Sequence, residues 1–356
     1  MKKYKQLLCI MMVVAIMLVM PFSSSAEGVI NETDAGIITA LQNTETIKQE
    51  MGLGSIDFCD IEIGNAITTY ECTNNGILEN DIMHPLMVND ELIAWAIEYE
   101  VDSVIYYQIT TFLVDEIKDN LDDNDAFAIL YDRGASYAYT GDELIRLKEF
   151  SNEIEDRIVL KSVADLSDDD MIELSIMGNA RILGYVSPPM PRVQVYYSCN
   201  VSFVTQYPPS EMCWAASIAC IVNYKKGTNL TAIDVAKMVF GSTNYDHTGS
   251  ENDCKYVLNT KYGLGYSTKS RPSDGVLLRN IQNKYPILAV FTQGTSVNHA
   301  VVIYGLHTTA GHVNIMDPAQ GFISTSSRNS SNVITYRDGG GSVMTLVGII
   351  SKYTTA

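Results

Sequence analysis

Apolar and polar positions divide the first 140 residues into three stretches with different periodicity. Apolar residues are continuous over 7–20, recur at helical spacing over 31–50 and alternate with polar residues through much of 56–140. A period of about 3.6 predicts an amphipathic helix, and a period of two predicts half-buried strands. The chain therefore predicts a helix over 31–50, capped by Asn31 or Thr33, and a short helix within 111–121. Strands are predicted over 66–70, 93–101, 103–112, 126–131 and 136–139.

A polar stretch and a proline-rich segment end the first half of the chain. Residues 142–184 are polar with a helical pattern, and the acidic run Asp168-Asp169-Asp170 fits either the first turn of a helix capped by Ser167 or a solvated loop. The three prolines within 187–191 cannot continue a helix, because proline lacks a backbone N–H and restricts the residue before it. We therefore expect an extended linker there, a domain boundary near residue 190 and a site open to processing.

The second half places helices before strands. Apolar residues cover nearly every face of a predicted helix over 210–223, which is typical of a central, buried helix. Further helices are predicted over 231–240, closed by Gly241, and over 273–283. Strands are predicted over 193–197, 287–292, 299–304, 312–316, 333–336 and 342–350. The fold class is therefore α+β: residues 191–356 form helices packed on an antiparallel sheet, and a small α+β domain with its own antiparallel sheet precedes them over 27–190.

The first 26 residues have the pattern of an export signal. Lys2, Lys3 and Lys5 precede the apolar stretch 7–20, and the small residues at 24–26 suit cleavage. The apolar stretch is short for a membrane-spanning helix. We therefore expect a secreted protein, released or held at the cell surface, that has no membrane contact after the signal is removed.

Charge is divided unevenly between the two halves. Residues 27–190 contain 34 Asp and Glu against 8 Lys and Arg, a net charge of −26, whereas 191–356 contain 8 against 13, a net charge of +5. An acidic domain that docks on its own basic partner would show this division, and so would an acidic domain kept soluble by its charge. The basic excess is small and scattered, which argues against nucleic-acid binding.

Six cysteines follow the predicted signal, at positions 59, 72, 199, 213, 220 and 254. None has the CxxC spacing of a zinc site, and no cofactor motif is present, so we expect neither a metal nor an organic cofactor. If Cys213 stays a free thiol, five remain, so a complete disulfide framework is not implied. Cys59 and Cys72 are a candidate local bridge, and Cys220 is expected to be a small buried apolar residue.

Cys213 stands at the start of the apolar helix, in the segment that runs from Gln206 through two prolines to Cys213-Trp214. Ser210 can cap this helix, which would place the cysteine in its first turn. There the positive end of the helix dipole favours the thiolate, which is the nucleophilic form. Taken alone, this pattern fits a buried structural cysteine equally well.

His299 is the histidine that heads an apolar strand, whereas His307 and His312 flank a turn and are expected to be solvated. Asp317 follows the next strand, and a hairpin would bring it close to His299. Asn314 is the alternative partner for the imidazole. Singly, His299 and Asp317 fit a half-buried strand histidine and an Asp-Pro turn.

Together the candidates form a set with complementary roles. Cys213 would be the nucleophile, His299 the base and Asp317 the residue that orients the imidazole. The Gln206 amide and the Cys213 backbone N–H would donate hydrogen bonds to a developing oxyanion.

The order Gln206, Cys213-Trp214-Ala215, Asn298-His299-Ala300 and Asp317-Pro318 resembles the papain-like cysteine peptidases over about 193–356. The closest likeness is to the compact bacterial branches, staphopain-like and bacteriocin-leader-peptidase-like. The resemblance implies a thiol protease in which these four residues take the roles given above, and whose substrates are proteins or peptides. The spacing of seven residues between Gln206 and Cys213 is one longer than in papain. The acidic half is similar to the pro-regions of secreted bacterial peptidases, which implies a zymogen with an intramolecular inhibitor.

Three hypotheses follow from these residues. The first is a secreted cysteine endopeptidase made as a zymogen. The second is an acyltransferase of the transglutaminase type, which uses the same Cys-His-Asp set to transfer an acyl group to an amine. The third is a secreted binding module with an inactive papain-like fold.

Overall fold

A computed structural model describes residues 32–73, 76–121, 126–131, 135–141, 143–149, 166, 172–173, 181–182, 196–206, 210–243, 245–294, 297–307, 312–339 and 341–356. Residues 1–35 and 36–356 are two separate compact units, and the first is described only at 32–35. The predicted signal at 1–26, the acidic run at 168–170 and the linker at 187–191 all lie outside the described residues. Among the helices of the described ranges, none combines the length and the apolar composition needed to cross a bilayer.

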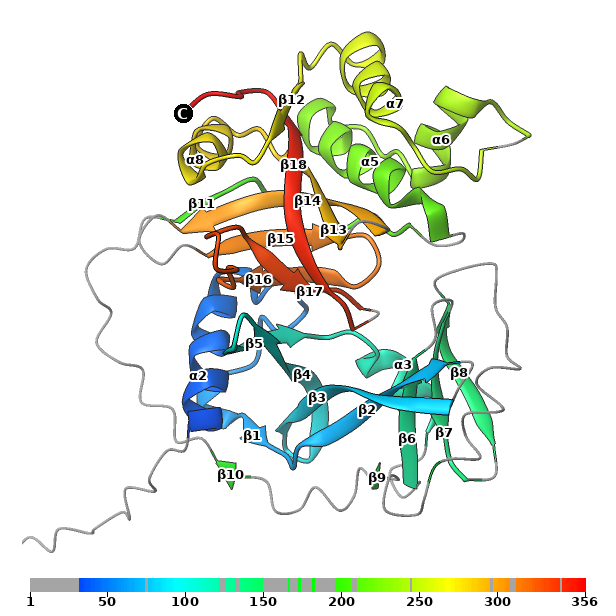
Figure 1. The fold of residues 1–356 in the computed structure, drawn as a ribbon, viewed down its shortest axis with the longest axis vertical. Coiled ribbons are helices and arrows are strands. Elements are labelled where there is room, and N and C mark those ends of the chain that lie inside the picture. The colour runs from blue at the N-terminus through cyan, green and yellow to red at the C-terminus, as the bar shows by residue number, and fades with distance from the viewer. Residues whose placement is uncertain are drawn as a thin grey trace, which may run out of the picture. The chain divides into compact units, whose positions relative to one another are not determined.

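The upstream region, which we define as the described residues of 36–182, is built around one sheet (Figure 1). The sheet order is β10-β1-β3-β2-β6-β7-β8, with β4 and β5 continuing from β3 and β9 beside β6. Its helices are α2 (Glu32–Thr44), η1 (Glu45–Ile47), η2 (Phe58–Asp60) and α3 (Val114–Asn120). Its strands are β1 (Glu62–Ile63), β2 (Ile67–Thr73), β3 (Gly76–Val88), β4 (Glu91–Val101), β5 (Val104–Thr110), β6 (Ala126–Tyr131), β7 (Ala135–Tyr139) and β8 (Leu144–Glu149). Two short strands that follow in the chain, β9 (Ile172–Glu173) and β10 (Arg181–Ile182), complete it.

The upstream sheet differs from the predicted one in three places. The long strand β3 was not predicted, because it contains Pro85 and a polar stretch, yet it pairs with both β2 and β4. The stretch 142–184 was predicted as helical but contributes the strands β8, β9 and β10, because pairing with β7, β6 and β1 overrides the local pattern. The predicted sheet was wholly antiparallel, whereas β2 and β6 run parallel.

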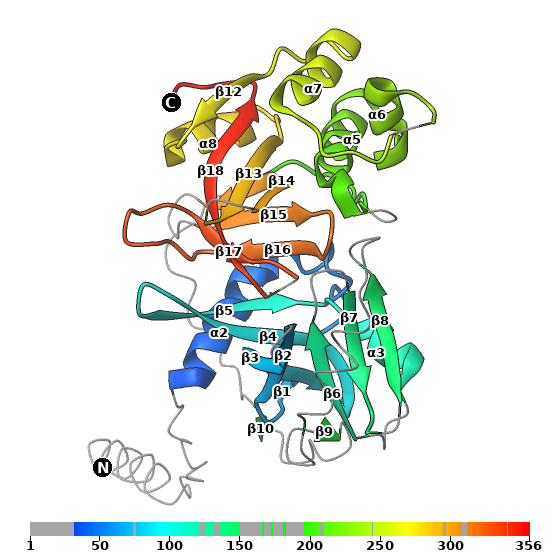
Figure 2. The ribbon, with the colours of Figure 1, turned by 45° about the vertical axis from the view of Figure 1, so that its right-hand side comes forward.

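The downstream region, the described residues of 196–356, joins helices to a second sheet whose pairings are all antiparallel (Figure 2). The order is β12-β18-β13-β14-β15-β16, with β11 beside β14 and β17 beside β18. Its helical segments are η6 (Ser210–Met212), α5 (Cys213–Lys226), α6 (Ala232–Phe240), α7 (Glu251–Lys255), the π-helical η7 (Tyr256–Lys261) and α8 (Asp274–Gln282). Its strands are β11 (Tyr196–Ser198), β12 (Ser267–Ser270), β13 (Ile287–Gln293), β14 (Val297–His307), β15 (Val313–Asp317), β16 (Gly321–Thr325), β17 (Thr335–Arg337) and β18 (Val343–Ser351).

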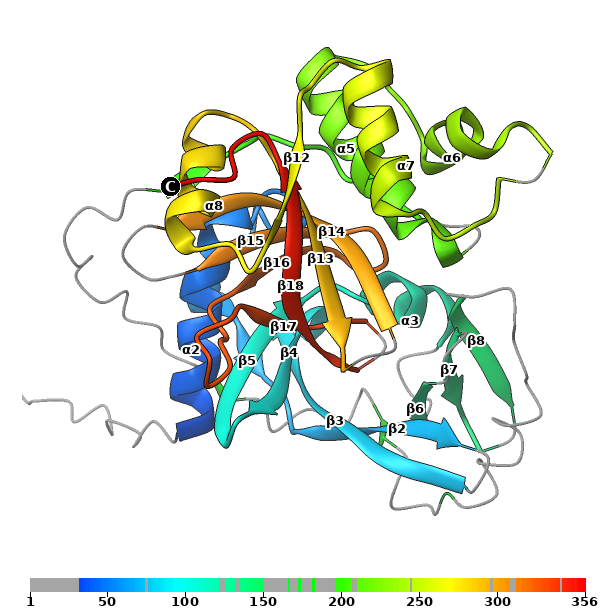
Figure 3. The ribbon, with the colours of Figure 1, turned by 45° about the horizontal axis from the view of Figure 1, so that its top comes forward.

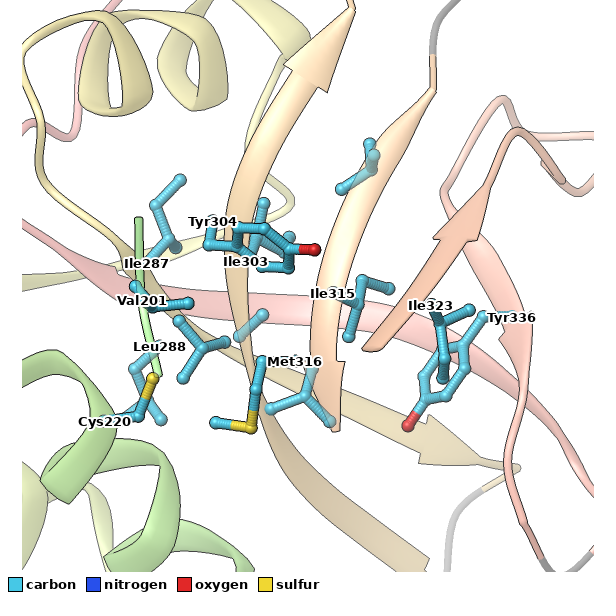
Figure 4. Close-up of a cluster of buried hydrophobic side chains, with 14 of the residues drawn as sticks. Val201, Cys220, Ile287, Leu288, Ile303, Tyr304, Ile315, Met316, Ile323 and Tyr336 are labelled. Atoms are coloured by element: carbon cyan, nitrogen blue, oxygen red, sulfur yellow. The ribbon is translucent and has the colours of Figure 1, made fainter. Parts of the chain in front are cut away.

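Helix α5 is the buried helix that its composition predicts. Every side chain from Trp214 to Val222 is buried, and Ser217 Oγ donates a hydrogen bond of 2.9 Å to the Ala300 carbonyl on β14. Figure 4 shows Cys220 of α5 among apolar side chains that include Leu288 of β13 and Met316 of β15, so the prediction of a small buried cysteine is confirmed. This packing fixes the start of α5 against the sheet.

The remaining elements agree with the pattern, apart from one cap and three missed segments. Helix α6 begins at a capping box made by Thr231 and Asp234 and ends at Gly241, as predicted. The cap of α5 is Met212, which makes no side-chain hydrogen bond, so the prediction of Ser210 as the cap is wrong. The segments that were not predicted are helix α7 with η7, strand β12 and strand β16, because their polar residues obscure the period.

The two regions share one apolar core. Strand β16 lies beside β5 and η1, and its closeness to β5 can be followed in Figures 1 and 3. Buried residues of both regions form one continuous cluster, which includes Ile37, Ile47 and Ile109 together with Ile303, Ile315 and Ile323. The upstream region therefore covers apolar surface that the downstream region would otherwise expose to water.

Candidate active site

Cys213 is the first residue of α5 and is partly exposed. The 3-10 turn η6 precedes it, so the cysteine lies in the first helical turn, where the helix dipole favours an anion. Because Trp214 to Val222 are buried, the position of the thiol follows from the packing of the helix behind it.

Trp214 anchors the loop that faces this helix start. Its indole Nε1–H donates a hydrogen bond of 2.9 Å to the His247 carbonyl, and its ring packs edge-on against Phe240. A Cβ at Gly249 would overlap the indole, so only glycine permits this approach. A second link joins the same loop to η6, because Thr248 Oγ1 donates to the Glu211 carboxylate.

The hairpin of β14 and β15 brings His299 to Asp317. The strands pair in register from Val302 with Met316, so the head of β14 lies beside the end of β15. His299 Nε2 lies 2.8 Å from Asp317 Oδ1. Asn314, the alternative partner, is instead bonded to Tyr196 Oη and Ser324 Oγ.

Asp317 is fully buried and accepts four hydrogen bonds. Oδ1 accepts from His299 Nε2 and from the Ala319 N–H, both at 2.8 Å. Oδ2 accepts from Gln320 Nε2 at 3.1 Å and from Tyr336 Oη at 2.9 Å. Both carboxylate oxygens are thus saturated, which compensates the cost of burying the charge.

Cys213, His299 and Asp317 form one chain of neighbouring side chains. The Cys213 thiol and the His299 imidazole lie close enough for each group to shift the pKa of the other. Because Nε2 faces Asp317, the other ring nitrogen, Nδ1, is the one that remains for the thiol. The His299 side chain is 14% exposed and the Asp317 side chain is 0% exposed, so the carboxylate is shielded from water whereas the imidazole is partly open to it.

The pKa values of the three groups shift toward the charged forms. Burial acts to raise the pKa of Cys213, but the hydrogen bond and charge of His299 and the Ala300 N–H lower it overall. Burial acts to lower the pKa of His299, but the charge and hydrogen bond of Asp317 raise it well above its ordinary value. Burial acts to raise the pKa of Asp317, and the His299 charge together with the hydrogen-bond donors lowers it. These directions favour a thiolate beside an imidazolium.

Gln206 lies next to this chain through its backbone. Its N–H donates a hydrogen bond of 3.2 Å to the Pro318 carbonyl, so Gln206 adjoins the residue that follows Asp317. Its side chain is buried. The oxyanion role that its position suggests remains a prediction.

Two predictions about other residues are wrong. His307 and His312 are buried rather than solvated, because their segment packs on Tyr196 and the upstream residue Thr46. The bridge between Cys59 and Cys72 is not formed, since Cys59 is exposed at η2 whereas Cys72 is buried in β2.

The geometry supports nucleophilic chemistry through sulfur. A thiolate held by an imidazolium can attack an acyl carbon, and the imidazolium can then supply a proton to the leaving group. Within the described residues, no group of three or more His, Cys, Asp or Glu side chains is arranged to hold a metal ion.

Sequence reasoning missed the residues that hold Asp317. Gln320 lies three positions after it in the turn before β16, and Tyr336 lies in a predicted strand, so both were visible in the sequence. No local signal shows that they point at the same carboxylate. Gln320 lies 3 positions after Asp317 and Tyr336 lies 19 positions after it, and only the folding of the strands brings both side chains to this carboxylate.

Comparison with known proteins finds a similarity between the downstream region and a protein family. Residues 195–333 match the sequence model of a family described as Papain-like cysteine protease AvrRpt2. A search of the curated proteins found no match to this chain. The expected likeness to the staphopain-like and bacteriocin-leader-peptidase-like branches stays a prediction. The matched segment contains Gln206, Cys213, His299 and Asp317, and it is similar to papain-like cysteine proteases.

Proposed function

We propose that this protein is a cysteine peptidase that hydrolyses peptide bonds through the Cys213 thiolate. The observation that carries the proposal is the bond of 2.8 Å between His299 Nε2 and the fully buried carboxylate of Asp317, with the thiol of Cys213 beside the same imidazole. The likeness of residues 195–333 to papain-like cysteine proteases supports the same reaction.

In the first half of the reaction, the Cys213 sulfur attacks the carbonyl carbon of the scissile bond. A C–S bond forms, and the carbonyl electrons move to the oxygen. His299 then gives its proton to the leaving amine, the C–N bond breaks, and a thioester remains.

In the second half, neutral His299 takes a proton from water, and the oxygen of that water attacks the thioester carbon. The C–S bond breaks, the acid product leaves, and the thiolate–imidazolium pair is restored. Asp317 stays ionised throughout, holding the ring orientation and stabilising the imidazolium. Gln206 and the Cys213 backbone N–H would donate hydrogen bonds to the oxyanion in both halves.

We also propose that the protein is exported through residues 1–26 and made as a zymogen. The acidic half, 27–190, would restrain the downstream region until the linker at 187–191 is cut. The shared apolar core supports docking of the two regions and implies that they stay associated after the cut.

Peptide hydrolysis by the chain 27–356 under mild reduction tests the activity. Wild type should cleave a mixed peptide library, and Cys213→Ala should lose turnover while keeping the circular dichroism spectrum. Cys59→Ser is the matched control, because Cys59 is an exposed cysteine of the upstream region. This variant should retain full activity. Full activity in Cys213→Ala would end the proposal, and amine incorporation exceeding hydrolysis would favour the acyltransferase.

Thiol reactivity gives an independent test within one molecule. The pKa of Cys213 is lowered, whereas the hydrogen bond that the Cys59 thiol donates to the Asp57 carboxylate raises the pKa of Cys59. Substoichiometric iodoacetamide at pH 6–7 should therefore modify Cys213 before the more exposed Cys59, as read by peptide mapping. Preferential modification of Cys59 would favour an inactive binding module.

Intact mass tests the zymogen proposal. Incubated wild type should be cut near residues 185–198, and Cys213→Ala should stay whole if the cut is made by the protein itself. The two fragments should co-elute in gel filtration because of their shared core. Hydrolysis by uncut protein at the same rate as by cut protein would contradict the zymogen.

A further inference from the structure

Asp317 is oriented by donors that do not belong to the Cys-His-Asp chain. Tyr336 Oη and Gln320 Nε2 both donate to Oδ2, the oxygen that His299 does not use. A carboxylate held on one oxygen could turn about its last bond, whereas donors on both oxygens fix its plane. The direction of the bond to His299 therefore depends on Tyr336 and Gln320.

These two donors converge on the backbone of Arg337. Tyr336 is the preceding residue in β17, so the path of the strand sets where its phenol points. Gln320 Nε2 also donates a hydrogen bond of 3.0 Å to the Arg337 carbonyl. A displacement of the chain at Arg337 would move both donors away from Asp317.

A buried glutamine of the upstream region holds that same point. Gln108 of β5 donates from Nε2 to the Arg337 carbonyl at 2.9 Å, and its Oε1 accepts from the Arg337 N–H at 3.1 Å. The carboxamide thus supplies the pair of hydrogen bonds that a neighbouring strand would make with β17. The Arg337 guanidinium is also ion-paired with Asp81 of β3, which ties the strand to the upstream sheet a second time.

We propose that Gln108 is a positioning residue of the active site, so that the upstream region holds Asp317 in register with His299. The path runs from Gln108 through the Arg337 backbone to Tyr336 and Gln320, and from both to Asp317. This inference rests on the proposed function. It gives the upstream region a supporting role after activation, in addition to any restraint before it.

The test compares Gln108→Leu with Tyr106→Phe in the full chain 27–356. Leucine has a similar volume but makes neither bond to Arg337. Tyr106 also joins the two regions, through a hydrogen bond to the Arg328 carbonyl, but it lies off the path to Asp317. The readouts are kcat, KM and the pH dependence of Cys213 alkylation by iodoacetamide.

Gln108→Leu should lower kcat about tenfold, which corresponds to about 1.4 kcal/mol, with KM unchanged. Asp317 raises the pKa of His299, so a misplaced Asp317 should lower that pKa. The alkaline limb of the kcat/KM profile, where His299 loses its proton, should then move to lower pH. Tyr336→Phe, which removes one donor within the downstream region, should shift the limb in the same direction. Tyr106→Phe should leave the limb in place even if it lowers the melting temperature.

Several results would overturn the inference. One is an unshifted limb in Gln108→Leu and Tyr336→Phe, and another is an equal shift in Tyr106→Phe. If Gln108→Leu does not fold, Tyr336→Phe and Gln320→Leu decide, because both lie on the path and need no change in the upstream region. The alkylation profile separates the two proposals. If wild type does not hydrolyse peptides but the alkylation profile of Gln108→Leu is shifted from that of wild type, the peptidase is refuted and the positioning role of Gln108 is supported.

Discussion

The two ends of the β14–β15 hairpin carry histidines in opposite electrostatic states. At one end, His299 meets the buried carboxylate of Asp317, and the pKa of the imidazole is raised well above its ordinary value. At the other end, the rings of His307 and His312 lie 5.9 Å apart, and among the described residues no carboxylate raises the pKa of either ring. Burial lowers the pKa of His307, and burial with the neighbouring imidazole lowers that of His312 to about 4.

The difference shows that burial alone does not decide the charge of a histidine. All three imidazoles are largely withdrawn from water. A fully buried carboxylate with four donors keeps His299 protonated, whereas Tyr196 stacks on His307 and offers no charge. A catalytic histidine in this fold is therefore recognised by its partner rather than by its strand.

The largest effect should come from removing the charge that distinguishes the two ends. Asp317→Asn keeps the shape of the side chain but loses the carboxylate, so His299 no longer gains an ionic partner. We expect kcat to fall by roughly 10²–10⁴-fold, measured with the peptide that wild type cleaves fastest. His312→Gln, a change at the opposite end of the same hairpin, should leave kcat unchanged, and an equal loss in that variant would remove the distinction.

The next effect concerns acid stability at the His307–His312 end. The folded pKa of His312 is about 4, below the unfolded value of about 6.5, so the unfolded chain binds the proton more readily between these limits. Stability should be complete above about pH 6.5 and should fall as the pH approaches 4, by up to about 3 kcal/mol for this residue. Urea unfolding at pH 7 and pH 4.5 measures the loss.

The stability that His299 contributes should depend on pH in the opposite direction. Its folded pKa is raised, so the stability it contributes is complete below about pH 6.5 and is lost as the pH rises through the raised folded value. Histidine NMR resonances followed across the titration distinguish the two ends directly.

The control for the acid prediction is a variant of His312. His312→Gln should reduce the loss of stability between pH 7 and pH 4.5, and an unchanged loss in that variant would assign it to other groups.

The smallest effect should come from the bond that holds the site end of β14 to α5. Ser217→Ala removes the hydrogen bond to the Ala300 carbonyl, at a cost of about 1 kcal/mol in the free energy of unfolding. Because Ala300 adjoins His299, kcat should fall slightly as well. Chemical denaturation measures the first effect, with Ser330→Ala at an exposed position as the control. A loss of stability in the control as large as in Ser217→Ala would show that the buried bond contributes nothing specific.

Much of the candidate site was predictable because its members follow local rules. The apolar run after Cys213 predicts a buried helix whose first turn presents the thiol, and the structure has that helix. Two apolar segments joined by a short turn predict a hairpin, which is enough to bring Asp317 near His299. Helices α6 and α8 were also predictable, since caps and periodicity lie within a dozen residues.

The sequence by itself determined the helix, the hairpin and the placement of Cys213 and His299 near their starts, because each depends on neighbours along the chain. Tertiary structure alone decided which of Asp317 and Asn314 meets the imidazole, and that His307 and His312 are buried. It also decided that Gln108 reaches the backbone of Arg337, 229 positions later. A period or a cap is set by local geometry, whereas a contact between distant segments depends on how two sheets pack, which no short pattern encodes.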